Sequence, residues 1–216
     1  MNLKLLHIFL LSTAGTFLLC TPFINTVELA NGLVTGKMCW FHLAMLFFSV
    51  CVFFVMLTKK GTVIAFTFSD PLVLFFAGGV LITYKWNLNP EPEKLIFAGQ
   101  LVILWFLLRY VLTAYREFKF FFLFVLMFTG LIEAVWGMQQ LHGYSHSNHS
   151  LFRLTGSFFN PGPYSGYIAV ILPVCLWTAL RFQKGMHYFA WICVGAILIV
   201  LPAGMSRSAW MAAVVA

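Results

Sequence analysis

Runs of about 20 apolar residues recur along the chain, and they restrict the fold more than any other feature. An α-helix of that length crosses the hydrocarbon core of a bilayer. Charged residues make up only 9% of the chain, against about 25% in soluble domains. Backbone N–H and C=O groups need partners inside lipid, and a helix supplies them within one segment. The sequence therefore predicts an all-α polytopic membrane protein whose main partner is the lipid bilayer.

The apolar runs predict about seven complete transmembrane helices and the start of an eighth. The predicted segments cover residues 5–23, 38–57, 70–84, 95–114, 120–140, 164–180, 188–203 and 208 onward. Asp70-Pro71 predicts the start of the third helix, with Asp70 as N-cap. We interpret residues 1–216 as a single transmembrane domain. Because the eighth run stops at Ala216, we expect the N-terminal portion of a longer protein.

The basic residues are scattered between the apolar runs, which predicts a membrane topology and no nucleic-acid partner. With the N-terminus in the cytoplasm, the outer turns hold five basic residues, namely Lys37, Lys85, Lys94, Arg153 and Arg207. The inner turns hold seven, namely Lys4, Lys59, Lys60, Arg116, Lys119, Arg181 and Lys184. Without Arg153 and Arg207, seven inner basic residues stand against three outer ones, as the positive-inside rule expects. This orientation puts one longer polar loop, before the sixth helix, on the outer side.

That loop carries Arg153 ahead of a bend rich in Gly, Pro and Asn. Gly156 lets the backbone approach a ligand closely, and Asn160 adds a side-chain amide donor. An arginine beside such donors is suited to bind phosphate. The alternative is that Arg153 only anchors the loop at the lipid headgroups.

A second arginine, Arg207, lies in Ser206-Arg-Ser-Ala-Trp210, where the seventh segment meets the eighth. An arginine beside apolar runs is costly unless it faces water, a headgroup or a partner. Ser206 and Arg207 are therefore candidate binding residues, and Trp210 a supporting one. The alternative is interfacial snorkelling, with Trp210 in the aromatic belt.

Glu133 lies inside the fifth segment and shares one helix face with Gly137 and Gln140. A carboxylate at that depth is a functional candidate by default, and it could hold Arg153 or Arg207 in place. The alternative is a structural polar contact between helices.

Three histidines, His142, His146 and His149, have spacings that suit a metal only in a helix. Gly and Ser between them favour a loop, so we expect no metal and no cofactor. The five cysteines form no C-x-x-C pair and are interpreted as small hydrophobes. No P-loop, G-x-S-x-G elbow or H-E-x-x-H motif is present, which gives no sign of an ATPase, serine hydrolase or zinc protease.

Two motifs together resemble the bacterial O-antigen ligase and O-antigen polymerase family. The first reads Arg153, Gly156-Ser-Phe-Phe-Asn-Pro-Gly162, Ser165-Gly166 and Leu172-Pro173, and the second reads Ser206-Arg-Ser-Ala-Trp210. Gln140, at the end of the preceding helix, also fits. The resemblance covers residues 139–216, and the first 138 residues match only in hydropathy.

The resemblance implies an inner-membrane glycosyltransferase that needs no metal. Such enzymes take a glycan from undecaprenyl pyrophosphate on the periplasmic face and pass it to a lipid A core, a glycan or a protein. It implies that Arg153 and Arg207 bind the donor pyrophosphate. We take Asn160 and Ser206 as further substrate-binding candidates, and Glu133, Gln140, Gly156 and Trp210 as supporting residues. The family's presumed catalytic base lies in a later periplasmic loop, so the catalytic residue stays unassigned.

Two alternatives remain open. Arginines and Glu133 at membrane depth could line the pathway of a transporter for a small anion. The early end of the last apolar run is also compatible with an inactive, truncated remnant.

Overall fold

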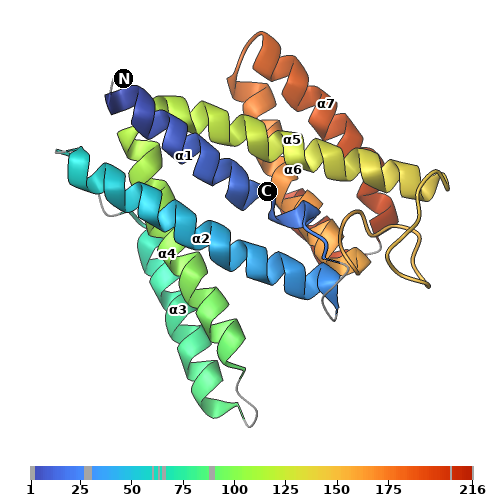
Figure 1. Cartoon of the computed structure of the whole chain (residues 1–216). Helices are drawn as coiled ribbons and strands as arrows, with labels where there is room; N and C mark the ends of the chain where they lie inside the picture. Colours follow the sequence, from blue (N-terminus) through green and yellow to red (C-terminus); the bar gives the residue numbers. More distant parts are fainter. Residues whose placement is uncertain are drawn as a thin grey trace. The chain divides into compact units, whose positions relative to one another are not determined.

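The computed structural model describes residues 3–26, 31–59, 61–62, 64, 67–87, 91–204 and 206–215. Within these ranges the chain is helical and has no strand (Figure 1). The α-helices are α1 (Leu3–Leu19), α2 (Gly32–Thr58), α3 (Ser69–Trp86), α4 (Pro92–Ala114), α5 (Arg116–Leu141), α6 (Pro161–Arg181), α7 (Gly185–Val200) and α8 (Arg207–Val215). Two short 3-10 helices, η1 (Thr21–Phe23) and η2 (Pro202–Gly204), follow α1 and α7.

Four of the described helices, α2, α4, α5 and α6, are long and apolar enough to cross a membrane. Helices α1 and α7 are apolar but have 17 and 16 residues. At 1.5 Å per residue such helices reach about 25 Å, short of the ~30 Å hydrocarbon core. The structure thus agrees with a polytopic helical membrane protein, while the number of seven spans stays a prediction.

The predicted segments correspond to the observed helices, and proline explains two of the differences at their ends. The first segment was expected to reach residue 23, but α1 ends at Leu19 and Pro22 lies in η1. The seventh was expected to reach residue 203, but Pro202 lies in η2, beyond the end of α7. Proline has no backbone N–H to continue an α-helix, so the chain tightens into a 3-10 turn at both places.

The chain divides into two compact units. Unit 1 comprises Met1–Leu18 and Phe41–Lys119, and unit 2 comprises Leu19–Trp40 and Phe120–Ala216. The boundaries fall inside α1, α2 and α5.

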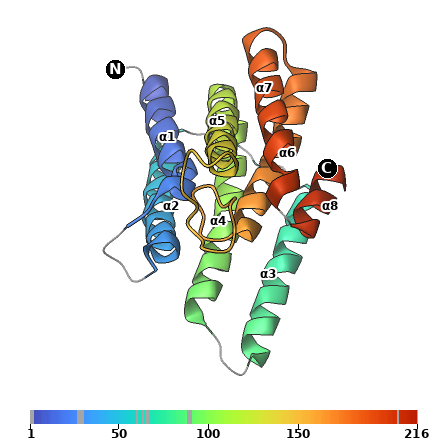
Figure 2. The same ribbon diagram turned by 90° about the vertical axis from the view of Figure 1, so that its right-hand side faces the viewer.

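In unit 1, α3 and α4 lie side by side as a helical hairpin (Figures 1 and 2). The start of α3 differs from the prediction, because the helix begins at Ser69 and Asp70 is not its N-cap. Asp70 lies in the first turn, where its Oδ2 accepts the Thr67 backbone N–H at 2.7 Å. This bond satisfies a backbone N–H just ahead of the helix.

Asp70 also joins the two helices of this hairpin. Its Oδ1 accepts the Trp105 Nε1–H at 3.0 Å and forms an ion pair with Arg109. The Asp70 residue is 1% exposed. A buried carboxylate is costly without partners, and here Thr67, Trp105 and Arg109 supply them.

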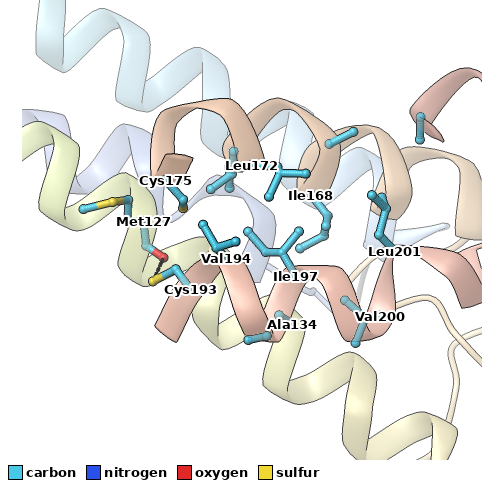
Figure 3. Packing of buried hydrophobic residues seen from close by; sticks show 14 of the residues in the cluster. Met127, Ala134, Ile168, Leu172, Cys175, Cys193, Val194, Ile197, Val200 and Leu201 are labelled. Atoms are coloured by element: carbon cyan, nitrogen blue, oxygen red, sulfur yellow. Dashed lines mark hydrogen bonds between the residues drawn. The ribbon is translucent and has the colours of Figure 1, made fainter. Parts of the chain in front are cut away.

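In unit 2, helices α5, α6 and α7 enclose an apolar core (Figure 3). Figure 3 shows Met127 and Ala134 of α5 facing Leu172 of α6 and Val194 and Ile197 of α7. Helix α8 packs against α6 as well. This core fixes the end of α5, the start of α6 and the end of α7, from which the candidate site is built.

Candidate functional site

The loop from residue 142 to residue 160 connects α5 to α6, and the Gln140 side chain holds it from the last turn of α5. Gln140 Oε1 accepts the backbone N–H groups of Thr155 and Gly156 at 2.9 and 2.7 Å. Its Nε2 donates to the carbonyl oxygens of His146 and Gly156, both at 3.1 Å. Gln140 is 3% exposed. This one amide therefore satisfies two buried N–H groups and two carbonyls that lie far apart in the loop.

Glu133 lies two turns below Gln140 on the same face of α5 and is fully buried. Its Oε2 accepts the Ser157 backbone N–H at 3.0 Å. Its Oε1 has no hydrogen-bond partner among the described residues. The expected pairing of Glu133 with Arg153 or Arg207 is not formed, because neither arginine makes an ion pair within the described part of the chain.

Lys37 comes from α2 and reaches the same loop. Its Nζ donates to the Ile24 carbonyl at 2.7 Å and lies 5.7 Å from the centre of the Phe158 ring. The Ser157 hydroxyl donates to the Pro22 carbonyl at 2.6 Å. The loop is therefore tied to α5 on one side and to the segment after α1 on the other.

Gly156 stands at the tightest point of the loop, between Gln140 and Glu133. Its φ is +54°, a conformation that a residue with a Cβ rarely adopts. A Cβ built there would also overlap Glu133 Oε2 and the ring of Tyr164. The sequence marks Gly156 for close approach to a ligand, and the structure explains this glycine by close approach to the protein's own side chains.

Tyr164 of α6 packs between Gly156 of the loop and Gly137 of α5. It is fully buried, and its hydroxyl donates to the Glu133 backbone carbonyl at 3.2 Å. A Cβ on Gly137 of α5 would overlap that hydroxyl, so the small residue allows the two helices to approach at this point.

Asn148 and Thr155 fix the outer part of the loop. Asn148 Nδ2 donates to the carbonyls of Gly156 and Phe158 at 3.2 and 3.1 Å. Thr155 Oγ1 accepts the Asn148 backbone N–H at 3.2 Å. Together with the Gln140 bonds, these contacts make the backbone on both sides of Arg153 part of one hydrogen-bonded frame.

Arg153 projects from this frame and is exposed. It lines two pockets. The first has a volume of about 570 Å³ and is also lined by His142, His146 and His149. The three histidines share this wall, yet no group of three or more His, Cys, Asp or Glu side chains among the described residues could hold a metal.

The second pocket, of about 350 Å³, joins the two sequence motifs. Arg153 and Pro161 line it together with Pro202 and Ala203 of η2, the turn just before Arg207. Close by, the Ser165 hydroxyl donates to the Gly204 carbonyl at 2.9 Å. The start of α6 and the end of α7 are thereby held against each other.

The remaining candidate residues lie at helix starts. Asn160 is exposed and precedes Pro161 as the N-cap of α6, without a side-chain capping bond. Ser206 precedes α8, and its Oγ accepts the Ala209 backbone N–H at 3.4 Å. Arg207 and Trp210, in the first turn of α8, are exposed. The hydroxyl of Ser206 is therefore occupied by capping, whereas the exposed Asn160 side chain makes no capping bond.

Sequence reasoning missed Lys37, Asn148 and Tyr164 as parts of this site, whereas it named Ser157 of the loop as a possible donor. A lysine between Gly36 and an apolar run resembles an ordinary topology signal. Asn148 looked like one more polar loop residue. Tyr164 could have been inferred, because a buried tyrosine hydroxyl needs a hydrogen-bond acceptor and Glu133 lies on the facing helix.

No family model matches the chain, and neither a curated protein nor a solved structure matches it. The resemblance to O-antigen ligases and polymerases rests on the two motifs alone. Any function must therefore be argued from the residues of the site.

Proposed function

We propose that the chain forms the donor-binding part of an inner-membrane glycosyltransferase of the O-antigen ligase or polymerase type. Its donor would be a glycan on undecaprenyl pyrophosphate at the periplasmic face, and its acceptor a lipid A core, a glycan or a protein. The observation that carries the proposal is the pocket shared by Arg153 and by η2, the turn just before Arg207. The two motif segments are close neighbours although about 40 residues separate them.

The chemistry of this pocket suits a pyrophosphate. A guanidinium is always charged and offers N–H donors in a fixed plane that matches phosphate oxygens in pairs. Arg153 and Arg207 are exposed and form no ion pair within the described residues. Their charge is therefore available to an incoming anion.

The frame around Arg153 supports binding because it is ordered before the donor arrives. The side chains of Gln140, Glu133 and Asn148 fix the loop backbone through seven hydrogen bonds. A loop that is already ordered loses less conformational entropy on binding. Gln140, Glu133 and Gly156 thus act as positioning residues, while Arg153, Arg207 and Asn160 face the ligand.

In the reaction that follows from this arrangement, an acceptor hydroxyl attacks the anomeric carbon of the donor sugar. The bond from that carbon to the pyrophosphate oxygen breaks, and negative charge develops on the departing pyrophosphate. Arg153 and Arg207 stabilise that charge. The proton of the acceptor hydroxyl needs a base, which is not assigned to any residue of this chain.

The alternative of an anion transporter has less support. It uses Glu133 as part of a pathway, but Glu133 is fully buried and bonded to Ser157 of the loop. A residue that holds a loop in place is poorly suited to meet a passing ion.

A genetic test separates these readings. The chain and its variants are returned, within the full reading frame, to a strain from which the gene has been deleted, and surface glycan is measured with protein level as control. Arg153→Ala and Arg207→Ala are expected to abolish the glycan, and Arg153→Lys to restore only part of it. Arg181→Ala, at the opposite end of α6, is the matched control and is expected to behave as wild type.

Normal glycan in both arginine variants contradicts the proposal. Uptake of a small anion by the protein in vesicles, with unchanged glycan after gene deletion, favours the transporter. A wild-type gene that is expressed but restores nothing favours the inactive remnant.

A further inference from the structure

The histidine pocket, which Arg153 shares with His142, His146 and His149, is not used by the proposed binding of pyrophosphate. Its volume is about 570 Å³, within the roughly 300–1,000 Å³ of sites that hold small organic ligands. The end of α5 and the loop that follows form it, and the Gln140 amide, bonded four times to the loop backbone, belongs to its wall. The frame that fixes the backbone around Arg153 therefore also shapes this pocket.

The lining of the histidine pocket combines hydrogen-bonding groups with apolar surface. Three imidazoles and several serines supply the former, and Leu151 and Phe152 supply the latter. Among the described residues of its lining, Arg153 is the only lysine, arginine, aspartate or glutamate. The part of a ligand that enters the pocket is therefore expected to be uncharged, with both polar and C–H groups. A sugar ring has this composition, because hydroxyls lie around its edge and C–H groups form its faces.

His149 offers a hydrogen-bond donor in a defined tautomer, next to exposed aromatic rings. Its Nδ1 accepts the Leu151 backbone N–H at 3.1 Å, so this nitrogen carries no hydrogen and the Nε2 is the N–H donor. The centre of its ring lies 4.8 Å from that of Phe152 and 5.2 Å from that of Phe159. These two phenylalanines are 37% and 40% exposed. An aromatic face beside a polar donor suits a ligand that is apolar on one side and polar on the other.

Ser145 lines the same pocket, and its buried Oγ has no hydrogen-bond partner among the described residues. A hydroxyl in this state is unfavourable. A hydrogen bond to a ligand in the pocket removes that cost, so Ser145 is a second group that the protein itself does not satisfy.

Arg153 stands between two pockets of different character. The motif pocket, which Arg153 shares with Pro161 and Pro202, is lined by apolar residues apart from this arginine, and both pockets include Leu151 and Phe152. A glycan donor has an apolar polyprenyl chain on one side of its pyrophosphate and a sugar on the other. With the pyrophosphate at Arg153, the motif pocket matches the start of the polyprenyl chain and the histidine pocket matches the sugar.

We propose that the histidine pocket binds the sugar that is attached directly to the donor pyrophosphate. Phe152 packs against a C–H face of this sugar, and the imidazoles of His146 and His149 bond its hydroxyls. The inference rests on the proposed function, because a pyrophosphate at Arg153 is what places the sugar in this pocket. It adds the residues that determine which sugar is accepted.

The experiment uses the purified full chain in a neutral detergent and measures dissociation constants by calorimetry. The ligands are farnesyl pyrophosphate, the same molecule carrying N-acetylglucosamine on its pyrophosphate, and free N-acetylglucosamine. The pocket variants are His146→Ala and His149→Gln, and Arg153→Ala reports on the pyrophosphate. Tyr144→Ala is the matched control, because Tyr144 belongs to the same loop and is exposed but does not line the pocket. His146 is exposed, so its variant keeps the test valid even if His149→Gln folds poorly.

The sugar-bearing ligand is expected to bind wild type more tightly than farnesyl pyrophosphate does. Each histidine variant should weaken binding of the sugar-bearing ligand about fivefold, the effect of one lost hydrogen bond, and leave farnesyl pyrophosphate unchanged. Arg153→Ala should weaken both ligands, and Tyr144→Ala neither.

The outcomes separate this inference from the proposed function. If Arg153→Ala weakens both ligands while the histidine variants bind the sugar-bearing ligand as wild type does, the inference is overturned and the proposed function stands. Histidine variants that weaken both ligands equally also overturn it. Weaker binding of free N-acetylglucosamine alone assigns the pocket to an acceptor sugar and overturns the donor assignment. If Arg153→Ala changes neither ligand, or wild type binds neither, the proposed function is contradicted and the inference falls with it.

Discussion

The two units of this protein treat buried charge in different ways. In unit 1, Asp70 is enclosed with Arg109 and Trp105, so its carboxylate is completely used by the protein. In unit 2, Glu133 is equally buried but bonds the backbone of a loop, and one of its oxygens has no partner among the described residues. Two arginines of unit 2, Arg153 and Arg207, are exposed and line or adjoin the candidate site.

The difference separates charge that holds helices together from charge that faces a ligand. A buried ion pair holds its two helices in a fixed geometry. Removing one partner leaves the other as an unpaired charge in an apolar environment. An exposed arginine on a fixed loop contributes little to folding and stays available for an anion. The two kinds of arginine should therefore respond to mutation in opposite ways.

The largest loss of stability is expected for Arg109→Ala, because Asp70 then stays buried without its cation. The apparent melting temperature in detergent should fall further than in any variant below. Asp70→Asn in the same background should recover part of the loss, since it removes the stranded charge. Lys85→Ala, exposed in the last turn of α3, serves as control. A double variant no better than Arg109→Ala would argue against a closed pair.

The next largest effect is expected for Gln140→Leu. The buried N–H groups of Thr155 and Gly156 lose their acceptor, and two orphaned groups cost about 4 kcal/mol in the free energy of unfolding. Gln139→Leu is the matched control, because Gln139 is next to Gln140 in the chain but is exposed. Limited proteolysis of the loop measures the effect locally. If the loop resists proteolysis equally in both variants, Gln140 does not hold it.

A somewhat smaller effect is expected for Gly156→Ala. The positive φ and the overlap with Glu133 and Tyr164 together cost about 3 kcal/mol. Gly162→Ala tests the same exchange where a Cβ meets open space, and its melting temperature should stay near that of wild type. Equal melting temperatures for the two variants would mean that the loop adapts easily.

The smallest effect on stability is expected for Arg153→Ala and Arg207→Ala. Both side chains are exposed, and exposed substitutions usually change the free energy of unfolding by less than about 0.5 kcal/mol. A large fall in melting temperature would place these arginines with Arg109 as structural residues. The comparison between the units would then fail.

The sequence predicts well those parts of the molecule that depend on local pattern. Apolar runs locate the helices, because each long apolar helix corresponds to one continuous apolar stretch of the sequence. The spacing of Glu133, Gly137 and Gln140 puts them on one face of α5, and in the structure all three meet the loop or Tyr164. The 3.6-residue period needs no tertiary information.

The parts that the sequence does not predict depend on which helices are neighbours. Asp70 and Arg109 are 39 residues apart, and nothing in the chain marks them as partners until α3 and α4 pack together. The same holds for Lys37 of α2, which contacts the Ile24 carbonyl and the ring of Phe158 in the loop. From the sequence, Glu133 could be expected to bind an arginine. In the structure its carboxylate accepts the Ser157 backbone N–H instead, a bond that forms only when the loop is folded.

Binding of a polyprenyl pyrophosphate to the purified chain tests the donor site most directly. A short-chain polyprenyl pyrophosphate is titrated into wild type, Arg153→Ala, Arg207→Ala and the control Arg181→Ala, and the dissociation constant is measured by calorimetry. Loss of a charge-assisted contact predicts at least about tenfold weaker binding in each site variant, with Arg181→Ala unchanged. Equal affinity in all four proteins would contradict the assignment of Arg153 and Arg207 to the pyrophosphate.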